Sequence, residues 1–330
     1  MKTHLFLQIV GTLFVCWTSS LSANRAYVSN QGSGTVSVID TASNIVTDTI
    51  TVGDSPVFLA ITPEGSKAYV SNLGSDNVSV INTASNTVAA TIAVEVNPYF
   101  VAITPDGSKA YVPNQASGTV SVIDTASNIV TDTIPVGTNP FFVAITPDGS
   151  KAYVSNQDSN NVSVIDTASD AVTSTITVGL IPLFVAITPD GSKAYISNLG
   201  SSNVSVIDTA SNIVTATITV GDSPYSIAIT PDPLPPAGLS GKQKKNVGAL
   251  QETRTNILTW TAPTSGRTPM QYKIYRNAAL TDLAGTVPAN SPLMFLDPSR
   301  KKNTVYTYFL VTVSATDDVS APVSITVKPR

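Results

Sequence analysis

The sequence predicts an all-β chain with two domains, a five-bladed β-propeller followed by an immunoglobulin-like β-sandwich. Three observations support this fold class. An Ala-Tyr pair recurs at intervals of 42 residues, from Ala26-Tyr27 to Ala194-Tyr195, and a fixed period of this length is typical of solenoids and propellers. Ser, Thr, Val and Asn are abundant and only 12% of the residues are charged, a composition that favours short strands joined by polar turns. After residue 232 the period is lost, which indicates a second domain.

The N-terminal residues 1–23 have the character of a secretory signal peptide. Lys2 is followed by an apolar run over residues 5–17 and then by small residues, and this run is too short to span a bilayer. We therefore expect a secreted or cell-surface protein with no transmembrane segment after signal removal. Cleavage would remove Cys16 and His4, the only cysteine and histidine of the chain. The mature chain could then form no disulfide, no Cys/His metal site and no His-dependent nucleophile system.

Each 42-residue unit contains four candidate strands, which in the second unit cover residues 57–62, 67–71, 77–81 and 87–94. The first two are joined by Thr62-Pro63-Glu64-Gly65, in which Pro fixes φ and Gly can take a positive φ. The third strand alternates apolar and polar residues, as a strand with one polar face does. The first strand is apolar on both faces, so we expect it to be buried on both sides as the innermost strand of a propeller blade.

The two ends of the repeat region are complementary. The repeat starts with a second strand at residues 26–29 and stops after a lone first strand at residues 225–230. Three strands from the N-terminal end and one from the C-terminal end would complete one composite blade. Residues 24–232 would then form a closed five-bladed ring that exposes no edge strand. An open solenoid would need polar capping repeats, and none is visible in the sequence.

The repeated segments Ala-Tyr-Val-Ser-Asn, Val-Ser-Val-Ile-Asp-Thr-Ala-Ser-Asn and Ile-Thr-Pro-Asp-Gly-Ser-Lys resemble the YVTN-type β-propeller repeat of surface-layer and other secreted proteins. The resemblance covers the repeat region and recurs in register. It implies a propeller and a role at or outside the cell surface. Members of this family often have seven blades. Five repeats therefore imply either a smaller ring or two chains that together complete a larger one, and we expect the five-bladed ring.

Variation among the near-identical units indicates where a ligand would bind. The Thr-Pro-Asp-Gly-Ser-Lys and Asp-Thr-Ala-Ser-Asn turns barely change, whereas the loops on the opposite face differ from unit to unit. Loops held on a rigid scaffold are where binding usually resides. We predict that an acidic arc and three stacking aromatic side chains bind a ligand at the channel mouth, namely Asp54, Glu95, Asp222, Tyr99, Phe141 and Tyr225. The alternative is that they are solvated loop acids and packing residues between blades.

The propeller and the C-terminal region carry opposite net charges. Residues 24–232 have a formal charge of −12 and residues 233–330 one of +7. An acidic propeller argues against nucleic acid as its partner. Some of its acids recur at one turn of each unit, and hydrogen bonds to their own backbone would account for them: Asp40, Asp124, Asp166 and Asp208, with Asn82 in the second unit.

The C-terminal region is predicted to be a separate β domain, residues 241–330, behind a Pro-rich linker at residues 233–240. Strand-like runs at residues 256–260, 271–276, 293–296, 305–313 and 323–327 suit an immunoglobulin-like sandwich of short strands. Trp260, residues 271–276 and Tyr306 resemble the core tryptophan, third strand and tyrosine corner of a fibronectin type III module. The resemblance implies core packing as the role of these residues.

The sequence favours a non-enzymatic secreted or cell-surface protein that binds proteins or envelope polysaccharide. A multivalent carbohydrate-binding lectin is an alternative, because near-identical blades would present equivalent grooves. A glycoside hydrolase is a third possibility, but it needs two facing carboxylates, and the predicted inner strands contain no charged residue. We therefore expect no catalytic residues, no cofactor, no metal site and no nucleic-acid partner. The sequence leaves open whether the ring closes within one chain or by pairing of chains.

Overall fold

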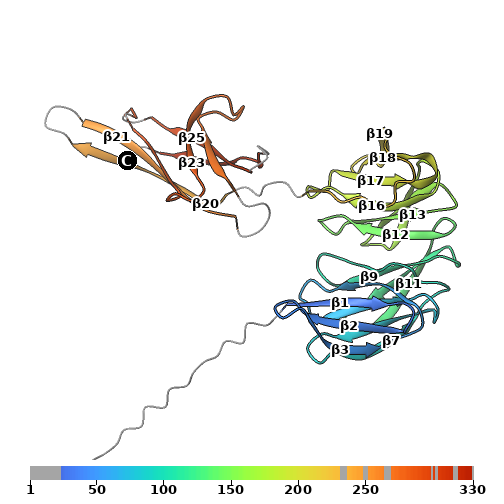
Figure 1. Ribbon diagram of the computed structural model, residues 1–330. Coiled ribbons are helices and arrows are strands. Elements are labelled where there is room, and N and C mark those ends of the chain that lie inside the picture. The colour runs from blue at the N-terminus through green and yellow to red at the C-terminus, as the bar shows by residue number, and fades with distance from the viewer. Residues whose placement is uncertain are drawn as a thin grey trace, which may run out of the picture. The chain divides into compact units, whose positions relative to one another are not determined.

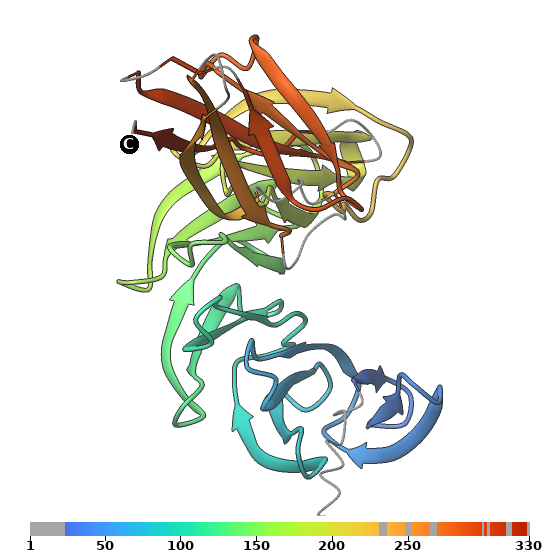
Figure 2. The same cartoon turned by 90° about the vertical axis from the view of Figure 1, so that its left-hand side faces the viewer.

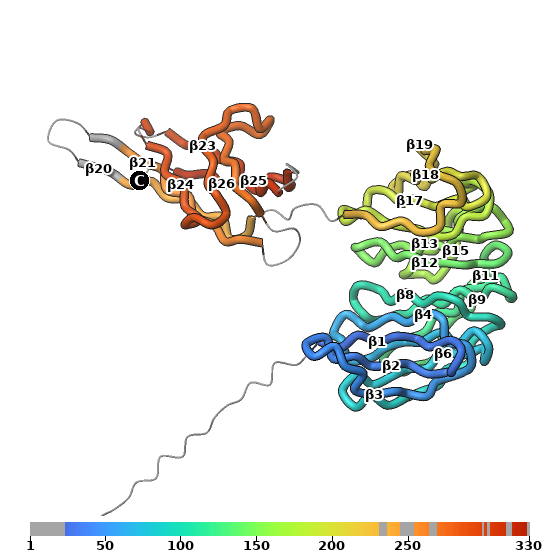
Figure 3. The backbone as a smooth tube through the Cα atoms, viewed as in Figure 1, coloured from blue at the N-terminus to red at the C-terminus, as the bar shows by residue number. Residues whose placement is uncertain are grey.

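The computed structural model, shown in Figures 1 and 3, describes residues 24–230, 236–247, 252–263, 269–298, 300–301, 304–314 and 319–328. The predicted signal peptide over residues 1–23 and the proline-rich residues 231–235 lie outside these ranges. The chain divides into two compact units, one that holds most of the repeat region and one that holds the C-terminal domain together with residues 186–193 and 228–230. The repeat region and the C-terminal domain are described one at a time. Within the described ranges the structure consists of strands and one short 3-10 turn, Leu199–Ser201. No helix in them is long and apolar enough to cross a membrane.

The repeat region folds into five antiparallel sheets, and strands that are neighbours in sequence are neighbours in each sheet. The first sheet contains β1 (Arg25–Asn30), β2 (Thr35–Asp40) and β3 (Ile45–Thr51), and the second β4 (Pro56–Ile61), β5 (Lys67–Asn72), β6 (Asn77–Asn82) and β7 (Thr87–Ala93). The third contains β8 (Ala102–Ile103), β9 (Lys109–Asn114), β10 (Thr119–Asp124) and β11 (Ile129–Pro135). The fourth contains β12 (Pro140–Ile145), β13 (Lys151–Asn156), β14 (Asn161–Asp166) and β15 (Ala171–Thr177), and the fifth β16 (Pro182–Ile187), β17 (Lys193–Asn198), β18 (Asn203–Asp208) and β19 (Ile213–Thr219). In the second sheet the strand ends agree with the predicted ends to within one residue.

The repeated turns close on themselves as their sequences predict. Gly65 takes a φ of 75°, and its N–H donates to the Thr62 carbonyl at 2.7 Å. At the other turn, Asp40 Oδ1 accepts hydrogen bonds from the N–H groups of Ser43 at 2.7 Å and Ala42 at 3.0 Å. The hydrogen bonds from Ser43 and Ala42 hold the pKa of the Asp40 carboxyl below its usual value. The turn aspartate therefore has a structural role.

The core of the repeat region lies between consecutive sheets. Ile50 of β3 packs with Val36 and Val38 of its own sheet against Ala68 and Val70 of the second sheet. Equivalent clusters join the second sheet to the third and the third to the fourth. Full burial of a Val, Leu, Ile or Phe side chain contributes roughly 1.5–3 kcal/mol relative to its exposed state. Each sheet is thus stabilised mainly by its neighbours along the chain.

The predicted ring does not close. Among the described residues β1 pairs only with β2, so the first sheet has three strands, and residues 224–230 belong to no strand. Val28 of β1 is 43% exposed, whereas its counterpart Val70 is fully buried. In Figures 1 and 2 the first sheet, in blue, and the fifth, in yellow, lie at opposite ends of the succession. The composite blade predicted from residues 26–29 and 225–230 is therefore wrong, because matching strand numbers do not determine whether the array curves far enough to bring its ends together.

The innermost strands are less buried than predicted. In β12 Pro140, Phe141 and Val143 are buried but Phe142, Ala144 and Ile145 are not, and in β4 only Pro56 is buried. Successive residues of a strand point to opposite sides. Neighbouring sheets nevertheless cover both sides of an interior sheet, since β13 is buried on both faces after Lys151. The exposure is therefore confined to the innermost strand, which forms the edge of its sheet.

The inner strand of the third sheet is shorter than its counterparts because of Pro113. In the fourth sheet, the hydroxyl of Ser155 accepts a hydrogen bond from the N–H of Phe142 at 3.2 Å. Pro113 stands at the position of Ser155 and has neither a hydroxyl nor an N–H. Phe100, the counterpart of Phe142, therefore lacks this anchor. β8 is reduced to two residues and one isolated bridge between Pro98 and Asn114.

The C-terminal domain consists of two sheets around one core. One sheet has the order β20-β21-β24, with β20 at Ala237–Val247, β21 at Glu252–Thr261 and β24 at Met294–Asp297. The other has the order β23-β22-β25-β26, with β22 at Gln271–Tyr275, β23 at Leu283–Pro288, β25 at Tyr306–Val313 and β26 at Val323–Val327. Leu258, Trp260, Tyr272 and Tyr308 are buried in the shared core. β20 begins inside the predicted linker, and neither β20 nor β23 was predicted as a strand.

A buried carboxylate lies at the centre of a hydrogen-bonded network within this domain. Asp297 is almost fully buried and accepts hydrogen bonds from the Arg276 guanidinium at 3.1 and 3.2 Å and from the Tyr308 hydroxyl at 2.6 Å. Burial alone would raise the pKa of Asp297, but the hydrogen bonds from Arg276 and Tyr308 outweigh it and lower the pKa. A buried charge whose partners are removed is costly, so this network is part of the domain's stability.

Candidate functional site

The innermost strands carry a continuous line of aromatic side chains. Three of them are the aromatic residues predicted for the channel mouth, and the structure brings these together. The ring centroids of Tyr99 and Phe141 are 4.5 Å apart, and those of Phe141 and Tyr225 are 6.5 Å apart. The complete line, in which neighbouring rings are 4.0–6.5 Å apart, is Phe58, Tyr99, Phe100, Phe141, Phe142, Phe184 and Tyr225. Tilted and edge-on pairs at such distances stabilise aromatic clusters.

The line ends at Tyr225, a residue that is 52% exposed. The hydroxyl of Ser197 donates to the Tyr225 carbonyl at 2.8 Å, the same contact by which Ser71 holds Tyr99 at 2.8 Å. Tyr225 is therefore held beside the fifth sheet as an inner strand would be, although no strand pairs with it. Burial first, and then the neighbouring Tyr225 hydroxyl, raises the pKa of Tyr99. Tyr99 and Tyr225 both lie against the ring of Phe141.

The three predicted loop acids lie on exposed loops that precede innermost strands or their counterparts. Asp54 is held through its backbone, whose N–H contacts the Ser75 hydroxyl and whose carbonyl accepts from Gly74 N–H at 3.0 Å. Beside Glu95, Val96 N–H donates to the Ser117 hydroxyl at 2.9 Å. No side-chain contact joins Asp54, Glu95 and Asp222 in the described residues, and no three His, Cys, Asp or Glu side chains there are arranged to hold a metal. The acids are therefore placed on the loops as predicted, but without a shared partner.

Each of these loops contains one residue in the left-handed backbone conformation, and in the last complete unit it is a β-branched one. Ile181 has a φ of 54°, at the position where Asn97 has 60° and Asn139 has 54°. Asn tolerates this region, whereas a β-branched residue is strained in it. The Ile181 N–H donates to Asn160 Oδ1 at 2.9 Å, which holds the strained conformation. Ile181 and the exposed Leu180 together make this loop apolar, unlike its counterparts in the other units.

A hydrogen-bonded latch that was not predicted joins each sheet to the next. The hydroxyl of Tyr153 on β13 donates to Asn212 Oδ1 at 2.8 Å in the following sheet, and Lys151 Nζ donates to the Thr209 carbonyl. The same tyrosine latch is made from Tyr27 to Asn86, from Tyr69 to Asn128 and from Tyr111 to Asp170. The constant 59-residue separation of tyrosine and acceptor is visible in the sequence, and it was the signal that could have revealed the latch.

The latch between the third and fourth sheets is ionic. Asp170 stands where the other units carry Asn, and it accepts from the Tyr111 hydroxyl at 2.6 Å and from Lys109 Nζ at 2.7 Å. Burial first, and then the hydrogen bond to Asp170, raises the pKa of Tyr111. Hydrogen bonds to charged groups are stronger than neutral ones, so this boundary is fastened differently from the others.

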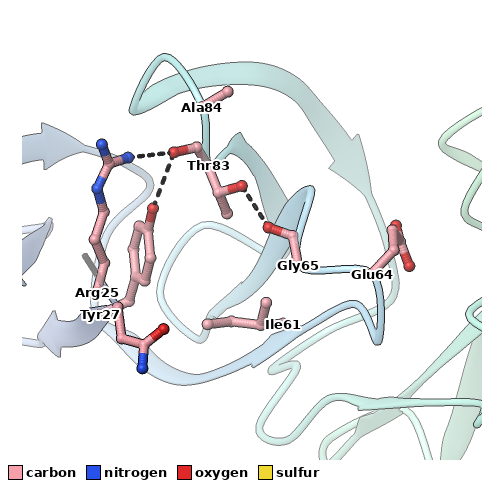
Figure 4. Close-up of a pocket in the computed structure, with 8 residues that line it drawn as sticks. Arg25, Tyr27, Ile61, Glu64, Gly65, Thr83 and Ala84 are labelled. Carbon is pink, nitrogen blue, oxygen red and sulfur yellow. Dashed lines mark hydrogen bonds between the residues drawn. The ribbon is translucent and has the colours of Figure 1, made fainter. Parts of the chain in front are cut away.

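A hollow of about 610 Å³ lies where the first and second sheets meet (Figure 4). The guanidinium of Arg25 and the hydroxyl of Tyr27 both point to the Thr83 carbonyl, and Glu64 lies across from them. The counterpart between the third and fourth sheets is about 340 Å³ and is lined in part by Thr104 and Asp106. The first sheet has no inner strand to supply such residues, which accounts for the larger hollow beside β1.

Comparisons with known proteins agree with this architecture. A family model described as a YNCE-like β-propeller matches residues 14–182, whereas no curated protein matches. Among solved structures, a functionally unknown protein from Desulfotomaculum acetoxidans DSM 771 is 18% identical, with 93% of this chain and 100% of that chain covered and a TM-score of 0.55. A protein from Bacteroides uniformis ATCC 8492, named as a candidate 6-phosphogluconolactonase, is 16% identical, with 62% and 71% covered and a TM-score of 0.53.

Kuenenia stuttgartiensis hydrazine synthase is 24% identical, with 81% of this chain covered, but this chain spans only 65% of its length and the TM-score is 0.48. Likenesses at such identities concern the fold alone. The match of the family model, by contrast, extends over half of the sequence, through the repeated sheets whose strands, turns and latches are described above. The chain belongs to the YNCE-like β-propeller family.

Proposed function

We propose that this chain is a non-enzymatic binding protein, secreted or held at the cell surface, whose propeller presents variable loops and an aromatic platform to a protein or an envelope polysaccharide. The observation that carries the proposal is the aromatic line, which runs across the innermost strands and ends in the exposed Tyr225. Exposed aromatic rings backed by packed ones offer a rigid surface of low entropy cost to a partner. The unlike loops with Asp54, Glu95 and Asp222 would supply the specificity.

The domain organisation belongs to the same proposal. We assign the five sheets of residues 24–230 as five blades and the C-terminal domain as a fibronectin type III-like sandwich. The strand order of its two sheets supports this assignment. So do the packing of Trp260 on Tyr272, with ring centroids 5.4 Å apart, and the Tyr306 hydroxyl, which accepts from the N–H of Lys301 at 3.0 Å as in a tyrosine corner. Such a domain would serve as a spacer or a second contact surface.

A carbohydrate-binding lectin is the second candidate, because sugars stack on exposed aromatic rings such as Tyr225. A glycan array with the purified protein separates the two. Saturable binding to a sugar that is lost in Tyr225→Ala and kept in Ile213→Ala, an exposed apolar residue on the distant β19, supports the lectin. Capture of a defined surface protein with the same dependence on Tyr225 supports the protein-binding role. Binding of neither kind, or binding indifferent to Tyr225, would overturn the proposed site.

We propose no enzyme activity. The likeness to a candidate 6-phosphogluconolactonase is at 16% identity and carries the fold only. A glycoside hydrolase would require two carboxylates facing each other across the sugar, and the inner strands are apolar. Incubation with 6-phosphogluconolactone and with envelope polysaccharide, followed by product analysis, checks this. Product release that is lost when Asp54, Glu95 or Asp222 is replaced by Ala would show that the predicted acids are catalytic and the proposal wrong.

A further inference from the structure

The boundary between two successive sheets has three components that recur along the chain. The tyrosine latch is one, and a serine hydroxyl bound to a carbonyl of the next inner strand is the second, as from Ser155 to the Leu183 carbonyl. The third is apolar: Ile50 of one sheet packs against Ala68 and Val70 of the next. Because the units are near-identical, any one sheet has the side chains to meet any other in this way.

At the C-terminal end of the array, the tyrosine and lysine donors of this boundary are left unused, whereas the serine donor, Ser197, is bound to the Tyr225 carbonyl. In the described part of the chain, Lys193 Nζ and the Tyr195 hydroxyl have no hydrogen-bond partner, although their counterparts Lys151 and Tyr153 both do. The apolar component is uncovered as well. Ile218 is 44% exposed, whereas its counterparts in the preceding sheets are 4–7% exposed.

At the N-terminal end, the acceptor half is left unused. Asn44 has a φ of 57°, like Asn86 and Asn212, which accept tyrosine hydroxyls. Its side chain is nevertheless exposed and has no such donor among the residues that the structure describes. Val28 is the counterpart of Val70, against which Ile50 packs, and it is the apolar surface that Ile218 would contact. β1 also has a free edge beside the hollow of about 610 Å³. The two ends of the array are therefore the two halves of one interface that the chain itself makes repeatedly.

We propose that the first sheet of a second copy of this chain docks on the fifth sheet, head to tail. Residues 224–230 would then pair with β1 of the second copy as its fourth strand. The register follows from β12 and β13, where Val143 lies opposite Val154 and Ala144 opposite Tyr153. It places Ile227 opposite Val28 of the second copy and Ala228 opposite its Tyr27. Tyr195 and Lys193 would reach Asn44 and the Thr41 carbonyl of that copy.

The second copy, and not the same chain, is the occupant because β3 and β19 lie at opposite ends of the array (Figures 1 and 3) and both apolar faces are uncovered. A free strand edge is also a template for pairing with another chain. The interface uses different surfaces on the two copies. It therefore repeats from copy to copy and ends only if the copies close into a ring.

Single cysteine variants test the pairing without allowing closure within one chain. Val28→Cys and Ile227→Cys are prepared separately on a chain with Cys16→Ser, mixed and oxidised. Opposed residues of a non-hydrogen-bonded antiparallel pair have Cα atoms about 4.5 Å apart, a distance that suits a disulfide. We expect a covalent dimer that contains one chain of each kind. Val154→Cys is the control, because Val154 is the buried counterpart of Val28, and its mixture with Ile227→Cys should give no covalent dimer. If this mixture cross-links as well as the mixture of Val28→Cys and Ile227→Cys, the proposed register is wrong.

Two further outcomes would overturn the proposal. One is an unmodified chain that sediments at its monomer mass of 34.3 kDa at concentrations up to hundreds of micromolar. The other is a Val28→Cys/Ile227→Cys double variant that cross-links within one chain. We expect instead that sedimentation of the unmodified chain shows concentration-dependent association. The Ile218→Asp variant should remain monomeric with an unchanged circular dichroism spectrum.

Discussion

Replacing Tyr153 by Phe tests whether the tyrosine latch holds successive sheets together. Its hydroxyl donates to Asn212 Oδ1 at 2.8 Å from a side chain that is fully buried. A neutral hydrogen bond contributes about 0.5–1.5 kcal/mol net to stability, and the substitution changes little else in the packing. We therefore expect Tyr153→Phe to lower the free energy of unfolding by about 1 kcal/mol. For a domain of about 150–250 residues this lowers Tm by about 2–4 °C.

The matched control is Tyr195→Phe, the same substitution one unit later. The Tyr195 hydroxyl has no partner among the described residues, so in dilute protein the change should stay within about 0.5 kcal/mol. Urea unfolding followed by circular dichroism measures both variants. Equal losses from the two variants in dilute protein would refute the reasoning, because the hydroxyl's partner would then be irrelevant. A cost for Tyr195→Phe that appears only at concentrations where the chain associates is the result expected from head-to-tail docking.

Three further predictions concern strain, pH and buried charge. Ile181→Asn should raise the free energy of unfolding by about 1 kcal/mol, since Asn occupies the left-handed conformation with little strain, and thermal unfolding measures this. Burial first, and then the charges of nearby acids, raises the pKa of Tyr69 and of Tyr153 to about 12. The stability that these phenols contribute should therefore be complete below pH 10. It should decline between pH 10 and 12 by up to about 1.4 kcal/mol per pH unit for each tyrosine, because the unfolded chain releases protons that the folded chain retains. Denaturant titrations measure this, and a free energy of unfolding that stays constant from pH 10 to 12 would contradict it. Asp297→Ala should destabilise the C-terminal domain by about 1.5–3 kcal/mol, because it removes the charged acceptor of Arg276 and of the buried Tyr308. Asp282→Ala, which removes a more exposed partner of Arg276, should cost about 1 kcal/mol or less.

The strands of the repeat region could be predicted because each is a local consequence of its residues. Thr62-Pro63-Glu64-Gly65 closes a tight turn, and the alternation of Val and Ser along β6 fits a strand with one polar face. The aromatic part of the candidate site could be predicted for the same reason. Tyr99, Phe141 and Tyr225 occupy the same position in their units, so a repeating fold places them side by side.

The ends of the array and the latches could not be predicted in this way. Whether β1 meets residues 225–230 depends on the angle between successive sheets, summed over the array, and no residue encodes that sum. The latch from Tyr153 to Asn212 joins residues far apart in sequence, and each of them also has an ordinary role, in a strand and in a turn. The strain at Ile181 was hidden because the conformation of the loop is imposed by its neighbours and not by Ile181 itself.

Pro113 and Asp170 act on the same boundary, between the third and fourth sheets. The proline removes a hydroxyl anchor from the inner side, and the aspartate adds an ion pair with Lys109 on the opposite side. The pair is partly buried, so dissolved ions screen it less than they screen pairs on the open surface. The third and fourth sheets are thus joined by an ion pair on one side and lack the serine contact on the other, an asymmetry that no other boundary among the described residues has.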